Sequence, residues 1–242
     1  YGITVNSLGS LTSFTNTGNV VVSAQGVASS AYGLIDRSGT LNSFTNSGLI
    51  NTKLQVGGLG KIVAVDLRAN TTGVTFSNTG TIDGDVFLGA GDTSVAISGA
   101  DASITGGITF QGGATKSGNN TFTIDAGSVL GPIDLGNGTH TFTLTGGAKA
   151  TGGLTQGTGA LTLAVDSSEL TILSTRQITT SSAIVTGAST ITFGINNSAA
   201  SLPGGILQSA GTVSIGAASK LTAAFTGLID DEKTFTLIRA NT

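Results

Sequence analysis

The stretch Ile82–Gly91 reads Ile-Asp-Gly-Asp-Val-Phe-Leu-Gly-Ala-Gly, and its pattern recurs along the chain. The pattern is apolar-x-Gly-x-apolar-x-apolar-Gly-x-Gly. Its first position returns 22 residues later at Ile104, 25 residues after that at Val129, and 21 residues further on at Ala150. Alternation with a period of two is typical of β-strands, and self-similarity at such spacings is typical of solenoids. The pattern therefore predicts a stack of short β-coils.

A longer match supports this repeat. Gly80–Gly99 aligns without a gap to Gly127–Gly146, and six of the twenty positions are identical. Each copy also carries a second alternating strand, marked by the pairs Val95 and Ile97, Phe122 and Ile124, Phe142 and Leu144, and Leu161 and Leu163. One coil of about 22 residues then holds two or three strands and buries its apolar face against itself and its neighbours. We expect about 11 layers and a rod about 50 Å long.

The predicted fold is all-β: a right-handed parallel β-helix forming a single elongated domain with a C-terminal cap-like segment. We divide it into solenoid coils at 1–165 and further coils with a cap at 166–242, because the repeat weakens after about residue 165. A barrel or sandwich would need two-residue hairpin turns, and the Asn137-Gly138 pair lies where the repeat places a coil corner. The glycines expected at coil corners are Gly84, Gly106, Gly131 and Gly152.

A different repeat marks the N-terminal part. Leu11–Gly18 returns as Leu41–Gly48, and Thr75–Gly80 is a shorter third copy. The phenylalanines of the repeat are expected in the core: Phe14, Phe44 and Phe76. The asparagines are expected to form an amide ladder in which each side chain bonds the next coil: Asn16, Asn46 and Asn78. The glycines that end each copy are expected to adopt positive φ at a turn: Gly18, Gly48 and Gly80.

The composition excludes several classes of protein. Charged residues are 10% and aromatic residues 5% of the 242 residues, and 38 are glycine. A helical surface would need more charge than this. The ten basic residues are scattered, so no nucleic-acid footprint is visible. There is no cysteine, and no apolar run approaches the roughly 20 residues of a membrane-spanning helix.

The Ser13–Gly18 and Thr81–Val95 segments resemble the β-helical passenger domains of bacterial autotransporters. The closing stretch Gly211–Ala240, with its Lys-Thr-Phe-Thr-Leu-Ile-Arg-Ala end, is similar to the segment that joins such passengers to their membrane barrel and helps them fold. The resemblance implies an extracellular or outer-membrane surface location. It also implies membrane attachment only through a β-barrel that would follow Thr242, so we expect a processed passenger or an excised part of one.

No catalytic, cofactor-binding or metal-binding residue is expected. His140, the only histidine, aligns with Thr93 in the repeat and is expected to face outward. The carboxylates Asp83, Asp85 and Asp92 lie near a glycine-rich corner but do not recur in later copies, which disfavours a calcium site. The polar run Asp230–Lys233 is expected to be a solvated turn.

We therefore expect a non-enzymatic extracellular structural or adhesive rod. Its partner would be a surface glycan or protein, or a second copy of the chain. The alternative is a filament subunit that stacks end to end through its open coil edges. A third reading is a polysaccharide hydrolase in which Asp83 and Asp85 point the same way from one strand. The third reading is disfavoured because Ser103, Thr105 and Gly107 on the next coil offer these carboxylates little polar support.

Overall fold

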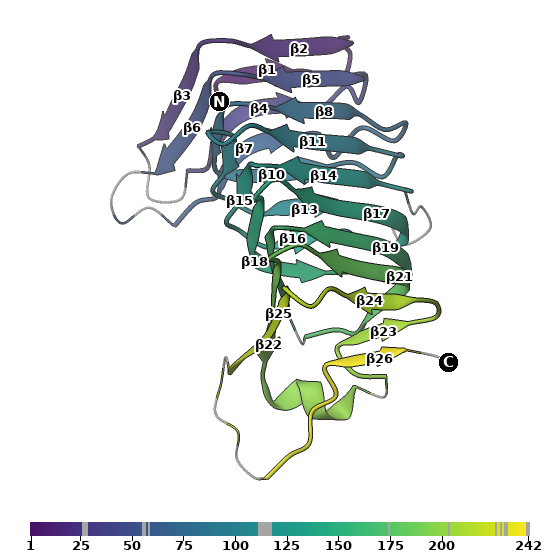
Figure 1. The fold of residues 1–242 in the computed structure, drawn as a ribbon. Helices are drawn as coiled ribbons and strands as arrows, with labels where there is room; N and C mark the ends of the chain where they lie inside the picture. Colours follow the sequence, from purple (N-terminus) through teal and green to yellow (C-terminus); the bar gives the residue numbers. More distant parts are fainter. Residues whose placement is uncertain are drawn as a thin grey trace.

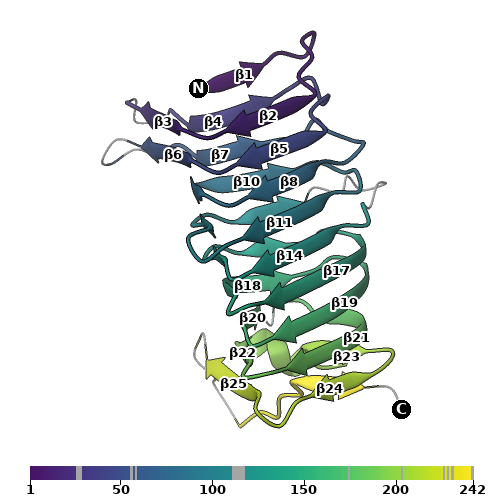
Figure 2. The ribbon, with the colours of Figure 1, turned by 45° about the horizontal axis from the view of Figure 1, so that its top comes forward.

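The computed structural model describes residues 1–25, 29–54, 57, 59–110, 118–173, 175–202, 204–225, 227, 229 and 232–240. These residues form 26 strands and one short 3₁₀ helix, η1 (Asn197–Ser201). All strand pairs between the named strands are parallel, in one sheet of 15 strands and one of 11. The chain winds as a parallel β-helix whose N-terminal and C-terminal coils lie at opposite ends of the stack (Figures 1 and 2). The predicted fold is confirmed.

The strands stack in three columns. Column 1 contains β1 (Ile3–Val5), β4 (Ala31–Asp36), β7 (Ile62–Asp66), β10 (Asp85–Leu88), β13 (Ile108–Phe110) and β16 (Ile133–Asp134). Column 2 contains β3 (Asn19–Ala24), β6 (Leu49–Leu54), β9 (Thr81–Asp83), β12 (Ser103–Ile104) and β15 (Ser128–Val129). Both columns then pair with β18 (Lys149–Thr155), and continue through β20 (Glu169–Leu173), β22 (Thr190–Ile195) and β25 (Lys220–Phe225).

Column 3 is the 11-stranded sheet. It contains β2 (Ser13–Asn16), β5 (Ser43–Asn46), β8 (Thr75–Asn78), β11 (Ser94–Ser98), β14 (Thr121–Asp125), β17 (Gly138–Thr145), β19 (Gly159–Asp166), β21 (Ile178–Thr186), β23 (Leu207–Ser209), β24 (Val213–Ile215) and β26 (Ile238–Ala240). An early coil therefore takes one strand from each column, whereas from β17 to β22 a coil consists of two longer strands.

The register follows the sequence repeat. Ile82 pairs with Ile104, Ile104 with Val129, and Val129 with Ala150. In column 3, Val95 pairs with Phe122, which lies in the core. The coils are unequal in length, because residues hydrogen-bonded one coil apart are separated by 32, 19, 27 and 20 positions in turn. The expected period of about 22 residues is thus a mean over unequal coils.

One expected alignment is wrong by two residues. The structure pairs Leu163 with Phe142 and Val165 with Leu144, so Leu161 lies opposite His140 instead. Both leucines and Val165 are buried. Side chains two positions apart point to the same face of a strand, so a shift of two keeps the apolar face inward and leaves no trace in the hydrophobic pattern.

The C-terminal segment continues the stack. β24 pairs with β21, β25 with β22 and β26 with β23. The expected strand at Thr234–Ile238 begins only at Ile238. Of the expected polar turn, Asp230 and Asp231 lie outside the described residues, and Lys233 donates to Asn197 over 3.1 Å. Among the described residues, no helix has the length and apolar character needed to cross a lipid bilayer.

Candidate functional site

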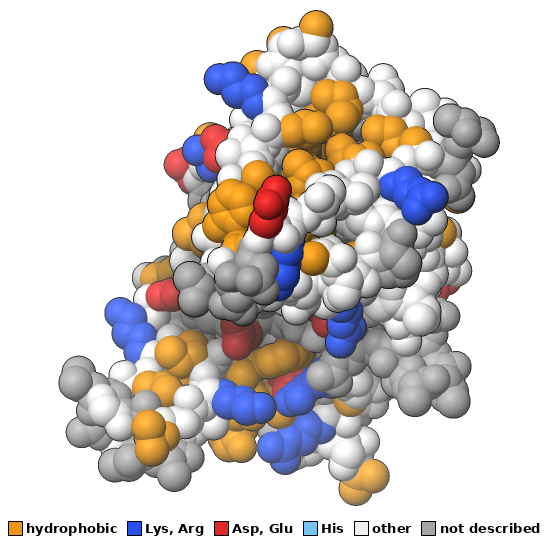
Figure 3. Space-filling view, turned by 90° about the horizontal axis from the view of Figure 1, so that it is seen from below, with side chains coloured by type: hydrophobic (Ala, Val, Ile, Leu, Met, Phe, Trp, Pro, Cys, Tyr) orange, Lys and Arg blue, Asp and Glu red, His pale blue; other side chains and the backbone are white. Residues whose placement is uncertain are grey.

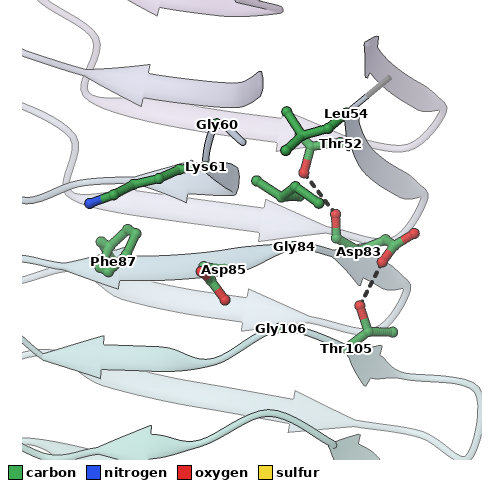
Figure 4. Close-up of a pocket in the computed structure, with 11 residues that line it drawn as sticks. Thr52, Leu54, Gly60, Lys61, Asp83, Gly84, Asp85, Phe87, Thr105 and Gly106 are labelled. Atoms are coloured by element: carbon green, nitrogen blue, oxygen red, sulfur yellow. Dashed lines mark hydrogen bonds between the residues drawn. The ribbon is translucent and has the colours of Figure 1, made fainter. Parts of the chain in front are cut away.

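A cleft lies at the corner between columns 1 and 2. In the sequence, seven residues separate β6 from β7, whereas Gly84 alone separates β9 from β10 one coil later. The cleft has a volume of about 580 Å³. Its described lining comes from three successive coils (Figure 4): Thr52, Leu54, Gly60, Lys61, Ile62, Asp83, Gly84, Asp85, Phe87, Thr105 and Gly106. We call it the Gly84 cleft.

The floor of the Gly84 cleft begins a column of stacked glycines. Gly84 has φ +132°, a backbone conformation that other residues rarely adopt. The glycines expected at the later corners do not have positive φ but approach one another closely. A Cβ on Gly106 would lie 2.3 Å from the carbonyl carbon of Gly84, on Gly131 2.2 Å from that of Gly106, and on Gly152 2.1 Å from that of Gly131. Glycine at these corners lets adjacent coils stack.

The two carboxylates of the cleft lie on different strands. Asp83 ends β9 and Asp85 begins β10, on either side of Gly84, so the expectation that both point from one strand is wrong. Each is bonded to the next coil. The Thr105 hydroxyl donates to Oδ1 of Asp83 over 2.6 Å, and the Gly107 N–H donates to Oδ1 of Asp85 over 2.9 Å. The next coil therefore supports both carboxylates, contrary to the sequence-based expectation.

A cation and an aromatic ring lie on the other side of Asp85 (Figure 4). Lys61 is exposed, and its ammonium has no hydrogen bond or ion pair with the described part of the chain. The half-buried ring of Phe87 lies 4.9 Å from the guanidinium of Arg68. Arg68 donates through Nε to Asp66 over 2.8 Å, and this hydrogen bond raises the pKa of the guanidinium. Arg68 is thereby held against Phe87.

The sequence marks Gly84 and Gly106 as corner glycines and Asp83 and Asp85 as nearby carboxylates, but no sequence pattern indicates that Lys61 and Phe87 lie beside them. Elsewhere on the early coils the rings of Tyr1 and Tyr32 stack with their centroids 5.2 Å apart.

No protein-family model matches the chain. No curated protein and no solved structure matches it either.

The asparagines of the N-terminal repeat form a continuous ladder inside the stack. Asn16 donates through Nδ2 to Oδ1 of Asn46, and Asn46 donates in the same way to Asn78, each over 2.7 Å. Each amide also donates to the carbonyl of the glycine two residues later. The ladder ends where Ile97 takes the next position in column 3.

Next to this ladder, the phenylalanines of the repeat stack in column 3. The ring centroids of Phe14 and Phe44 are 5.4 Å apart, and those of Phe44 and Phe76 are 4.3 Å apart. Phe44 and Phe76 are buried, whereas Phe14 in the first coil is half-buried. The ring stack and the amide ladder belong to the scaffold and not to the Gly84 cleft.

The glycines after this ladder do not have positive φ, and the expectation that they would is wrong. Two of them are needed for close approach instead. A Cβ on Gly48 would lie 2.0 Å from the carbonyl oxygen of Gly18, and a Cβ on Gly80 would lie 2.2 Å from that of Gly48. A Cβ on Gly18 would meet nothing, because no described coil lies above it.

His140 is buried, with 1% of its surface exposed, so the expected outward position is wrong. It lies two residues before the core residue Phe142, and alternation therefore points both side chains inward. Its Nδ1 accepts a 3.3 Å hydrogen bond from the Asn120 N–H, whereas its Nε2 is buried without a partner among the described residues. Burial lowers the pKa of the imidazole. His140 faces the core and not the Gly84 cleft.

The third carboxylate of the expected acidic group lies elsewhere. Asp92 accepts a 2.7 Å hydrogen bond from the Asn119 N–H, and it does not line the Gly84 cleft. Among the described residues, no three or more His, Cys, Asp and Glu side chains gather where they could hold a metal ion.

Proposed function

We propose that this chain is a non-catalytic extracellular rod with a structural or adhesive role, like the autotransporter passengers that its sequence resembles. The observation that carries the proposal is the continuous parallel stack, in which backbone pairing joins each coil to the next and the Asn16–Asn46–Asn78 ladder adds side-chain bonds between the first three coils. Such a stack provides a rigid, extended outer face and needs no disulfide to hold it. Its weakly charged, threonine-rich surface suits contact along a face.

The arrangement of Asp83 and Asp85 favours binding over hydrolysis. Glycoside hydrolysis needs two carboxyl groups that flank one bond, one of them kept protonated by an apolar setting. These two side chains extend from different strands and are half-exposed. One oxygen of each accepts a hydrogen bond from the next coil. Their role in coil-to-coil contacts supports a carboxylate pair that binds and does not react.

Adhesion and turnover can be tested in one assay. The purified chain would be applied to immobilised extracellular-matrix proteins and polysaccharides while the release of reducing ends is measured. We expect retention on at least one surface without release of reducing ends. Release that disappears in the Asp83→Asn variant would overturn the non-catalytic function.

Antibody labelling of intact cells that express the full gene would test the extracellular location, and labelling only after permeabilisation would contradict it.

A specific observation also favours the filament alternative. β1, β2 and β3 at one end, and β24, β25 and β26 at the other, each pair on one side only among the described residues. Unpaired strand edges are templates for further strands. Hydrophobic side chains are exposed on the C-terminal end of the stack (Figure 3), and the last coil exposes Ile215, Leu221 and Phe225. A head-to-tail contact of this kind would extend the stack from one copy to the next.

A further inference from the structure

We infer that the Gly84 cleft binds a short segment of a neutral oligosaccharide. The inference rests on the proposed adhesive function and names the ligand class of one site on the rod. The cleft volume of about 580 Å³ lies within the range of small-molecule sites. Three coils contribute to the lining, so the site exists only when the stack is formed.

Hydrogen-bond acceptors stand at the floor of the cleft. Asp83 and Asp85 each give one oxygen to the next coil, and no described residue donates to the second oxygen of either carboxylate. Ionised carboxylates are strong acceptors that bind hydroxyl donors well. The two free acceptors lie on either side of Gly84 (Figure 4), so each can accept from a different hydroxyl group of a bound sugar segment.

Donors and apolar surface stand beside these acceptors. The exposed ammonium of Lys61 offers donors to ring or hydroxyl oxygens. Phe87 and Ile62 provide apolar surface against which the C–H face of a pyranose can pack. Arg68, held by Asp66, keeps the ring of Phe87 in place before any ligand arrives. A preorganised ring reduces the entropy cost of binding.

The charges of the cleft disfavour anionic ligands. The carboxylates of Asp83 and Asp85 outnumber the single ammonium of Lys61, which disfavours uronic acids, sulfated sugars and phosphates. A sugar hydroxyl both donates and accepts, so one neutral ligand can satisfy both kinds of group. Neutral oligosaccharides are therefore the class that fits acceptors, donors and an aromatic ring within one cleft.

Isothermal titration calorimetry of the 242-residue chain with oligosaccharides would test this inference. The probes are the tetrasaccharides of cellulose, starch, mannan, galactan and chitin, with a galacturonate tetrasaccharide as the charged comparison. The test variant is Asp85→Asn, which keeps an oxygen for the Gly107 N–H. The control is Asp125→Asn, because Asp125 also accepts a hydrogen bond from the next coil, there from the Thr145 hydroxyl over 3.1 Å, and does not line the cleft.

We expect at least one neutral tetrasaccharide to bind with a dissociation constant below about 5 mM. Asp85→Asn should weaken that binding about tenfold or more, whereas Asp125→Asn should change it less than about twofold. The inference is overturned if no neutral probe binds, if the galacturonate probe binds more tightly, or if the two variants have equal effects. The two ideas can fail separately. If Asp85→Asn still adheres to a surface, the proposed adhesive function stands even when the inference about the cleft fails. Release of reducing ends by the parent chain would overturn the proposed non-catalytic function.

Discussion

The side-chain amide of Asn46 donates a 2.7 Å hydrogen bond to Oδ1 of Asn78, one coil further along the stack. Both side chains are fully buried, and Asn46 also accepts from Asn16. A buried amide placed in this way uses its donor and its acceptor in one line parallel to the backbone bonds. Cooperative polarisation strengthens such a line of bonds in a low-dielectric interior.

Replacing Asn46 should therefore be costly. Asn46→Ala removes the central amide and leaves both neighbouring asparagines without their ladder partner, so we expect the free energy of unfolding to fall by about 2–4 kcal/mol. Urea unfolding followed by circular dichroism would measure it. Asn42→Ala, at an exposed position of the same coil, is the control and should change stability by less than about 0.5 kcal/mol. Equal losses in both variants would contradict the ladder's role.

Replacement of glycine by alanine should affect stability differently at Gly106 and at Gly18, because the space around the two residues differs. Gly106→Ala places a Cβ 2.3 Å from the carbonyl carbon of Gly84, so we expect the stacked coils to separate locally and stability to fall by about 1–3 kcal/mol. Gly18→Ala meets no atom within 4 Å, and it should be neutral or slightly stabilising. Thermal melts of the two variants would compare them. A melting temperature for Gly106→Ala equal to that of the parent would contradict close stacking at this corner.

His140 should make the stability of the rod depend on pH. Because burial lowers the pKa of the folded imidazole, the unfolded chain binds a proton more readily between the folded pKa and about 6.5. The free energy of unfolding should therefore decrease as the pH falls below about 6.5, by at most about 1.4 kcal/mol per pH unit from this group.

The His140 effect can be isolated by substitution. His140→Leu introduces the residue found one coil later at Leu161 and should remove this part of the pH dependence. Urea midpoints at about pH 7.5 and about pH 5.0 would be compared in parent and variant. If the parent lost no more stability than the variant on acidification, His140 would not be the titrating group.

End-to-end association should depend on the exposed side chains of the last coil. Phe225 is 64% exposed, and Phe225→Lys places a charge where a second copy would pair. We expect negative-stain electron microscopy of the parent chain to show fibres that lengthen with concentration, and the variant to show short rods. Thr141→Lys, at an exposed position of β17 away from the ends, serves as the charge-matched control and should still form fibres. Isolated rods of the parent at every concentration would exclude the filament.

The scaffold can be predicted from the sequence because its repeats place the same residue types at the same position of successive coils. Phe14, Phe44 and Phe76 recur at a constant offset from their asparagines, and a side chain that repeats in register meets its own copy in the next coil. The repeat aligns His140 with the polar residue Thr93 and so predicts an outward position, whereas alternation from Phe142 points His140 inward. Thr93 is itself buried.

The sequence by itself determined the parallel stack, its core face and its corner glycines, because each coil must bury the same alternating pattern against the next. Only the tertiary structure decided where a cleft opens. The cleft is lined by residues of three successive coils around Gly84, which only the stacking of the coils brings together. Lys61, Asp85 and Phe87 line the same cleft because unequal coils are stacked in register. A local sequence pattern cannot indicate which residues of unequal coils come to lie together.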